Sequence, residues 1–328
     1  MDMRSRLLQP LFRFVQSKLF QRSAHEIKTT KPSIMGCAVV ELEADMLTCK
    51  NEPKLVLDSK TTAPRKTEFY HHAFYEAPSI RKFNDLYYLI YSSGNNNELA
   101  YATSLYPDRD FIYRGVLISN ADIDYKGNKK PKSPAGTIHG SVEKINDSYY
   151  IFYHRLTHNT DFSRQACAER IYMDENGLFA QVEITTMGLS TKPLIADGRY
   201  MAALCCNLYG KKRYKIGNKV SHKNPRVFDD ENEVYIKDVC NGTVIGYKYF
   251  AFIGKTSFSI KYRGLGTGQL IIRVQEDGEV LAKYDVTPSL TWKKIKKMVN
   301  FPSGTYPLFI SYEGKGKIDI KEIWFNEN

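Results

Sequence analysis

Two stretches of the chain, 62 residues apart, share one pattern of apolar and polar positions. The first reads Lys-Phe-Asn-Asp-Leu-Tyr-Tyr-Leu-Ile-Tyr from Lys82, and the second reads Lys-Ile-Asn-Asp-Ser-Tyr-Tyr-Ile-Phe-Tyr from Lys144. In each, an Asn-Asp pair separates two runs of strand-forming residues, which predicts a β-hairpin. A repeat of this length, built from short strands, is typical of propeller blades that stack around one axis. We therefore expect equivalent positions of the two copies to lie side by side near a central channel.

Strand-type patterning covers most of the chain. Residues 34–209 have room for about three propeller blades. Residues 210–229 are basic and punctuated by Gly, Asn and Pro, which predicts a linker. Residues 230–328 contain strands at regular spacing, with a hairpin signal at Asp277-Gly278, and predict a β-sandwich of the jelly-roll type. The expected fold class is all-β, a partial five-bladed propeller followed by a sandwich.

The segment 1–33 has a different pattern. Its apolar residues fall at helical spacing and its other side is rich in Arg and Lys, which predicts a basic amphipathic helix. It lacks the uninterrupted apolar stretch and small-residue cleavage site of a secretory signal. A mitochondrial-type leader, a helix that covers a propeller edge, and the accidental start of a shortened reading frame are the three interpretations.

Composition excludes several classes of protein. With 328 residues and 42% hydrophobic positions, the chain can build the cores of about two domains. The net charge of +11 is scattered outside the N-terminus, which argues against nucleic-acid binding. No apolar run approaches the ~20 residues that span a membrane. The six cysteines show no CxxC spacing, so we expect no zinc site.

Three residues near the repeats are candidates for chemistry. Glu76 is flanked by aromatic residues that would desolvate its carboxyl and raise its pKa, which suits a proton donor. His139 precedes Gly140 and can bind a cation or a water, or orient a substrate hydroxyl. Arg164 can hold a carboxylate or sugar hydroxyls. The structural alternatives are an exposed strand-end glutamate, a buried histidine and a surface ion pair.

Five ordered segments together resemble glycoside hydrolase family 43, namely residues 74–82, 87–93, 139–141, 149–155 and 163–169. The resemblance runs from about residue 34 to 205. Residues 239–325 are similar to a family 6 carbohydrate-binding module, with Tyr247 and Trp292 among the markers. Family 43 implies a five-bladed propeller that hydrolyses arabinofuranosyl or xylosyl linkages of plant polysaccharides with inversion.

The resemblance also implies roles for single residues. Glu76 matches the general acid, and Arg164, His139 and Phe74 match residues at the substrate. His139 would support a calcium ion in the channel through a water molecule, and no other cofactor is expected. The expected partner is an oligo- or polysaccharide. Full-length relatives are expected to be secreted or periplasmic, whereas this chain shows no secretory signal.

The catalytic set departs from the family pattern. The family's general base and a second, pKa-tuning aspartate precede the acid, typically before a proline. Upstream of Glu76 the aspartates are Asp2, Asp45 and Asp58, and none of them precedes a proline. We therefore expect this chain to be weak or inactive as an enzyme. The alternative is a non-catalytic carbohydrate-binding protein that uses Trp292 or Tyr247, and we expect Trp324 and Phe250 to lie in the core.

Overall fold

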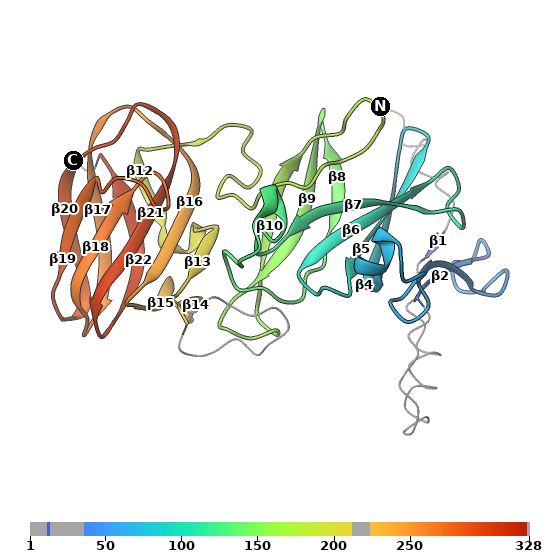
Figure 1. The fold of residues 1–328 in the computed structure, drawn as a ribbon, viewed down its shortest axis with the longest axis horizontal. Coiled ribbons are helices and arrows are strands. Elements are labelled where there is room, and N and C mark those ends of the chain that lie inside the picture. Colours follow the sequence, from blue (N-terminus) through green and yellow to red (C-terminus); the bar gives the residue numbers. More distant parts are fainter. Residues whose placement is uncertain (1–11, 14–35, 212–223, 327–328) are drawn as a thin grey trace, which may run out of the picture.

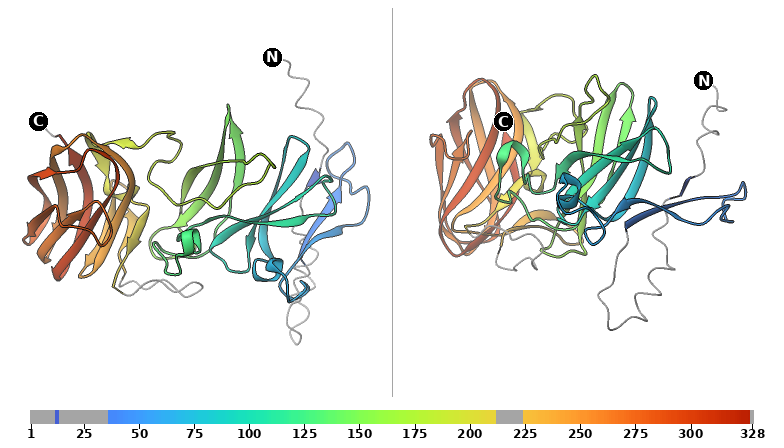
Figure 2. Two further views of the ribbon diagram at one scale, coloured as in Figure 1. Left: turned by 45° about the horizontal axis from the view of Figure 1, so that its top comes forward. Right: turned by 45° about the vertical axis from the view of Figure 1, so that its right-hand side comes forward.

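The computed structural model describes residues 12–13, 36–211 and 224–326. These residues form strands almost throughout, and the helical turns among them are α2 (Glu68–His71), η1 (Tyr125–Gly127) and η2 (Ala202–Leu204). Figures 1 and 2 show the sheets arranged along the long axis, with the C-terminal sandwich at one end and β2 at the other. The predicted all-β class is confirmed.

The sheet at the N-terminal end has three antiparallel strands, in the order β1 (Phe12–Arg13), β2 (Gly36–Glu41) and β3 (Lys54–Asp58). The rest of the predicted basic helix of residues 1–33 lies outside the described residues. The two described positions are extended, because Phe12 and Arg13 pair with Glu41 and Val40 along a strand edge that needs hydrogen-bond partners. At these two positions the helix prediction is wrong.

The first copy of the repeat lies in a four-stranded antiparallel sheet, in the order β4 (Phe74–Phe83), β5 (Leu86–Ser93), β6 (Glu98–Ser104) and β7 (Ile112–Ser119). The predicted hairpin is confirmed, since Phe83 pairs with Leu86 across the Asn-Asp turn. Asn84 has a φ of 52°, a left-handed conformation that asparagine tolerates better than most residues. The interior strands β5 and β6 are mostly buried, as strands covered on both faces are.

The second copy lies in a three-stranded antiparallel sheet of β8 (Ser141–Ile145), β9 (Ser148–Leu156) and β10 (Arg164–Ile171). Its inner strand lies against that of the first copy. Ser79 Oγ donates to Ser141 Oγ at 2.8 Å, and Arg81 Nε donates to Glu143 Oε2 at 3.3 Å. Each of these pairs is 62 residues apart, so equivalent positions of the repeat touch, as the sequence predicts.

The two repeat sheets share one hydrophobic core, to which both Tyr-rich strands contribute. Tyr88 and Ile90 of β5 pack there with Ile151 and Tyr153 of β9. Phe179, from the segment after β10, fills the same core, and its backbone bonds with the hydroxyl of Tyr101. Most of the tyrosines in these strands therefore serve packing.

The C-terminal part is a sandwich of two sheets (Figure 1). One sheet has the order β11 (Leu194–Ile195), β16 (Thr243–Phe252), β21 (Gly304–Lys315), β18 (Thr267–Arg273), β19 (Ala282–Val286), with β13 (Asn207–Tyr209) also on β16. The other has the order β14 (Arg226–Asp229), β15 (Val234–Cys240), β22 (Lys317–Phe325), β17 (Lys255–Gly264), β20 (Ser289–Asn300), with β12 (Gly198–Met201) also on β22. The hairpin predicted at Asp277-Gly278 is the β18–β19 pair.

The sandwich core confirms one aromatic prediction and corrects another. Phe250 is fully buried there, in contact with Phe325. Trp324 is only partly buried and lies on the outer face, with Lys294 Nζ 4.6 Å from its ring centroid. Its neighbours Ile323 and Phe325 take the core side, and at the β-strand period of two this directs Trp324 outward.

The domain boundaries differ from those predicted. Strands β11, β12 and β13 lie within the predicted propeller region 34–209, yet each pairs with β16 or β22 of the sandwich. Of the predicted linker 210–229, residues 212–223 lie outside the described residues, and Arg226–Asp229 form β14. The sandwich therefore begins near residue 194, because short strands from the preceding region complete its sheets.

Candidate active site

The structure brings Glu76 and His139 together. Glu76 lies near the start of β4 and His139 lies just before β8, the equivalent strand of the second sheet. Oε1 of Glu76 is 3.0 Å from Nε2 of His139, and the two side chains are 28% and 38% exposed. The meeting of these two side chains, expected from the repeat, is confirmed.

A second histidine, His154, was not predicted as part of the site, and it holds His139 in place. The backbone N–H of His139 donates to Nε2 of His154 at 3.0 Å, and the two rings meet edge to face. Burial, followed by the charges of Arg164 and His139, lowers the pKa of His154 to about 4, so this imidazole is neutral at pH 7. Its Nδ1 is buried and has no hydrogen-bond partner within the part of the chain that the structure describes.

The signal for His154 is present in the repeat itself. In the first copy the residue after the last tyrosine is Ser92, and in the second copy it is His154. Ser92 Oγ donates to the carbonyl of Ile138, directly beside His139. Both positions therefore support the loop that carries His139.

Gly140 permits this arrangement. A Cβ at Gly140 would lie 1.9 Å from the carbonyl oxygen of Phe152 and 2.9 Å from Cδ1 of Leu99. Only glycine allows the chain after His139 to pass this close to β9. Gly140 therefore sets the position of His139 just before β8.

The electrostatics of Glu76 differ from the prediction. The hydrogen bond from His139 lowers the pKa of Glu76 below its ordinary value of 4.5, and the charges of His139, Arg164 and His154 act in the same direction. Burial acts in the opposite direction but is incomplete, so the predicted rise in pKa is wrong. In this structure Glu76 is a carboxylate at neutral pH, paired with an imidazole.

Of the other two predicted site residues, Arg164 is exposed near the Glu76–His139 pair and Phe74 is buried in a core. Arg164 is exposed at the start of β10, where its Nε donates to the carbonyl of Asp161 at 3.0 Å. Its positive charge lowers the pKa of both Glu76 and His154. Phe74 is 3% exposed and packs against Tyr91 in the core. We therefore assign Phe74 to packing and correct its predicted contact with substrate.

The residues of this site do not fit a directly bound calcium ion. Calcium takes six to eight oxygen ligands, whereas this site offers the carboxylate of Glu76 and imidazole nitrogens. The described ranges 36–211 and 224–326 contain no group of three or more His, Cys, Asp or Glu that could hold a metal ion. The predicted support of calcium by His139 through water stays a prediction.

Tyr247 and Trp292, the sandwich residues predicted to contact sugar, both form hydrogen bonds within the protein. Tyr247 is fully buried, and its hydroxyl donates to the carbonyl of Ala202 at 2.9 Å, so a sugar cannot reach it. Trp292 is partly buried, and its Nε1 donates to both carboxylate oxygens of Glu233. The cations of Arg263 and Lys321 lie 4.3 Å and 5.5 Å from its ring centroid. Stacking of sugar on Trp292 stays a prediction.

The sequence model of the glycosyl hydrolases family 43 matches residues 19–179, the region that carries Glu76, His139, His154 and Arg164. Residues 19–179 belong to glycosyl hydrolase family 43. The chain is also 38% identical over 300 residues to a xylosidase/arabinosidase of Thermoclostridium stercorarium. That match covers 88% of this chain and 63% of the relative, so the chain spans less than two thirds of the relative's length.

Two solved structures are similar over parts of this chain. An arabinoxylan arabinofuranohydrolase of Bacillus subtilis, in complex with cellotetraose, is 19% identical with a TM-score of 0.43, over 90% of this chain and 60% of that one. CsCBM6-3 from Clostridium stercorarium, in complex with cellobiose, is 15% identical with a TM-score of 0.35, over 42% of this chain and all of that one. Because these TM-scores are low, the family assignment rests on the sequence relatives. Among the described residues, no helix is long and apolar enough to cross a membrane.

Proposed function

We propose that the protein is a glycoside hydrolase that acts on arabinofuranosyl or xylosyl linkages of plant polysaccharides, with Glu76 as general acid. The observation that carries this proposal is the Glu76–His139 pair, at 3.0 Å, inside the family 43 region. We further propose that sheets β4–β7 and β8–β10 are successive blades of a partial five-bladed propeller, and that the sandwich is a jelly roll. The contacts between equivalent strands support this.

The proposed acid step uses a proton on Glu76. As the glycosidic bond breaks, the leaving oxygen takes this proton, which avoids release of an alkoxide. His139 holds the carboxyl in position, and Arg164 orients the sugar through its exposed guanidinium. Because the pKa of Glu76 is lowered, the proton-bearing form is scarce at neutral pH. Any acid catalysis by Glu76 is therefore expected to increase toward acidic pH.

Inversion also needs a general base. Inverting glycosidases place a second carboxyl roughly 6.5–9.5 Å from the acid, with the attacking water between them. Within residues 36–211 and 224–326, no carboxylate is among the groups that shift the pKa of Glu76. Asp45 is exposed and bonds its own turn at Leu47 and Thr48. We propose that this chain hydrolyses glycosides weakly, since loss of a general base costs on the order of 10²–10⁴ in rate.

The test uses azide as a substitute for the missing base and its water. Azide needs no deprotonation, so it can attack C1 of a nitrophenyl arabinofuranoside or xyloside from the face opposite the leaving group. The C1–O bond breaks, a C1–N bond forms, and nitrophenol leaves with the proton of Glu76. We expect little nitrophenol without azide and an inverted glycosyl azide with it. Glu76→Gln should lower the azide product far more with the matching phenyl glycoside, whose poorer leaving group needs the proton, than with the nitrophenyl glycoside. The exposed Glu143→Gln on neighbouring β8 is the matched control.

The outcomes separate the two candidate functions. Formation of glycosyl azide that depends on Glu76 supports the proposal that Glu76 is the general acid of a glycoside hydrolase. Turnover at ordinary enzyme rates without azide, lost in Glu76→Gln, would overturn the weak activity and keep the reaction class. Binding of xylo- or arabino-oligosaccharides without any product would instead support the non-catalytic carbohydrate-binding protein.

A further inference from the structure

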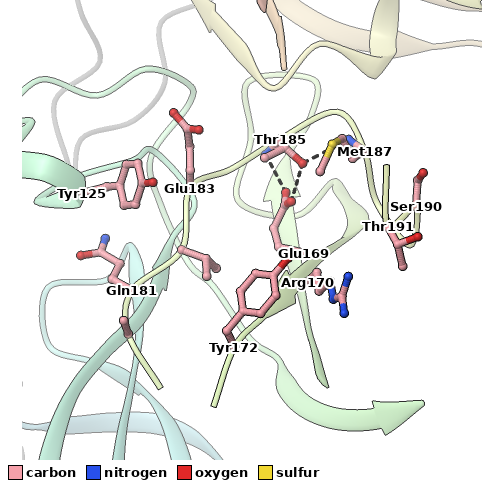
Figure 3. A pocket seen from close by; sticks show the side chains of 12 residues that line it. Tyr125, Glu169, Arg170, Tyr172, Gln181, Glu183, Thr185, Met187, Ser190 and Thr191 are labelled. Atoms are coloured by element: carbon pink, nitrogen blue, oxygen red, sulfur yellow. Dashed lines mark hydrogen bonds between the residues drawn. The ribbon is translucent and has the colours of Figure 1, made fainter. Parts of the chain in front are cut away.

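A cavity lies away from the Glu76 site. Its volume is about 350 Å³, and it is lined by the end of β10, by residues 180–191 and by Tyr125 of η1. None of Glu76, His139, His154 and Arg164 lines it. Figure 3 shows its side chains converging from these separate segments. The cavity therefore cannot be part of the site described above.

The two carboxylates of this cavity are already satisfied by the protein. Glu169 is 3% exposed and accepts a hydrogen bond from Tyr153 Oη at 3.1 Å. It also accepts from the backbone N–H and the hydroxyl of Thr185 at 2.7 and 2.5 Å (Figure 3). Burial raises the pKa of Glu169 to about 7. Glu183 accepts from Lys248 Nζ at 2.8 Å and from Tyr249 Oη at 2.7 Å. Neither carboxylate is available as the principal contact for a ligand.

The groups that remain available are a guanidinium and an aromatic ring. Tyr172 is 65% exposed, and the guanidinium carbon of Arg170 lies 5.0 Å from its ring centroid. The guanidinium of Arg170 makes no hydrogen bond or ion pair within the part of the chain that the structure describes, whereas its backbone belongs to the β10–β9 ladder. Figure 3 shows both side chains beside the cavity, with Gln181 on another wall. The Nε2 of Gln181 donates to the carbonyl of Ile123, which leaves its Oε1 for a ligand hydroxyl.

A second stacked pair shows what is particular about Arg170. Arg109 lies 3.7 Å over the ring of Tyr106, and its guanidinium also contacts the carboxylates of Asp108 at 2.9 Å and Asp110 at 3.7 Å. Arg170 has the same aromatic partner but no carboxylate. A planar guanidinium that lacks its acid, on the wall of a cavity, is suited to a carboxylate brought by a ligand.

We propose that this cavity is a second carbohydrate site, which binds a uronic acid residue. The carboxylate of the sugar pairs with the fork of Arg170, its C–H face covers the ring of Tyr172, and a hydroxyl donates to Gln181 Oε1. An apolar platform with a few placed polar groups is the usual composition of such a site, and 350 Å³ is sufficient for a sugar ring. Only the choice of a xylose-based carrier rests on the proposed function.

The test compares two ligands on the full chain by isothermal titration calorimetry. One is a xylotriose that bears a glucuronosyl group, and the other is neutral xylotriose. We expect the acidic ligand to bind more tightly, with an advantage that decreases as salt is added. Arg170→Ala and Tyr172→Ala should each weaken acidic-ligand binding by roughly tenfold, since a hydrogen-bonded ion pair and a stacked ring each contribute on this order. Arg109→Ala and Tyr106→Ala are the matched controls and should leave it unchanged.

Two further variants keep the test decisive. Arg170→Lys retains the charge but loses the planar fork, so it should recover only part of the affinity. In Glu76→Gln the affinity advantage of the acidic ligand over neutral xylotriose should persist, which separates this site from the proposed hydrolase site. Equal affinities for the acidic and neutral ligands, or an unchanged affinity in a folded Arg170→Ala variant, would overturn the proposal.

Discussion

Lys248 joins the sandwich to the sheets that carry the candidate site, and its replacement should destabilise the protein. It is 8% exposed on β16, and its Nζ lies 3.2 Å from Asp122 Oδ2 and 2.8 Å from Glu183 Oε1. Asp122 and Glu183 belong to segments outside the sandwich. Lys248→Met keeps the aliphatic stem and removes only the charge, so packing changes little.

The magnitude follows from the burial of Asp122. Its side chain is 4% exposed, and burial raises its pKa to about 6 even with Lys248 present. Removal of one member of a buried ion pair costs about 3–5 kcal/mol, because the remaining charge is left uncompensated. Protonation of Asp122 limits this cost. Because its pKa in the folded protein is already about 6, placing a proton on it at pH 7 costs only about 1.4 kcal/mol. Glu183 also loses its cation, so we expect a loss of about 1–3 kcal/mol at pH 7.

The sign of the pH dependence is a second prediction of the same variant. Without Lys248, the folded-state pKa of Asp122 rises further above its unfolded value. A carboxyl with a raised folded-state pKa lowers stability as pH increases from the unfolded pKa toward the folded one. The deficit of Lys248→Met relative to the unchanged protein should therefore be smallest near pH 5 and largest above pH 7.

Urea unfolding at pH 5 and pH 7.5 measures both effects. The two tryptophans, Trp292 and Trp324, lie in the sandwich, so their fluorescence reports its unfolding, and circular dichroism reports the whole chain. The double variant Lys248→Met/Asp122→Asn should recover much of the loss, because both charges of that pair are then absent. A deficit below about 1 kcal/mol, or one that is equal at the two pH values, would refute the reasoning.

Two further predictions concern local structure. Glu98, hydrogen-bonded to His72 at 2.6 Å, raises the pKa of His72, so this pair stabilises the fold below about pH 6.5 and the contribution is lost as pH rises through the folded-state value. As pH rises through the pKa of His72, the melting temperature should fall less in His72→Gln than in the unchanged protein. The same pH dependence of melting temperature in both proteins would show that the His72–Glu98 pair is not coupled to folding. Gly140→Ala should destabilise by about 1–3 kcal/mol or more through its clash with the carbonyl of Phe152. Gly94→Ala, whose Cβ would meet nothing nearer than 3.9 Å, is the control, and equal melting temperatures for the two variants would contradict the clash.

Local patterns predicted the hairpins well. An Asn-Asp turn between two β-forming runs fixes its own register, and both such hairpins are present. The repeat also predicted the meeting of Glu76 and His139, because stacking identical units places equivalent residues side by side. These features depend on contacts within one unit or between adjacent copies of it.

Features that depend on distant contacts were not predictable in this way. The sandwich recruits β11, β12 and β13 from the preceding region, since the edges of β16 and β22 accept any strand that reaches them. The family resemblances implied that Tyr247 and Phe74 contact sugar, yet packing places both in a core. Nothing in the sequence distinguishes a core aromatic residue from a binding one until the facing layer is present.

The identities of the site residues and the spacing of the repeat were determined by the sequence by itself. Which charges surround those residues was decided only by the tertiary structure. Glu76 was expected to have a raised pKa from its aromatic neighbours in the chain, but His139, 63 residues away, reverses the direction. The surroundings of Arg170 were also decided by folding: its guanidinium lies against the ring of Tyr172 and pairs with no carboxylate within the described structure. Electrostatic energies depend on distances in space, and the chain brings those groups together only when it folds.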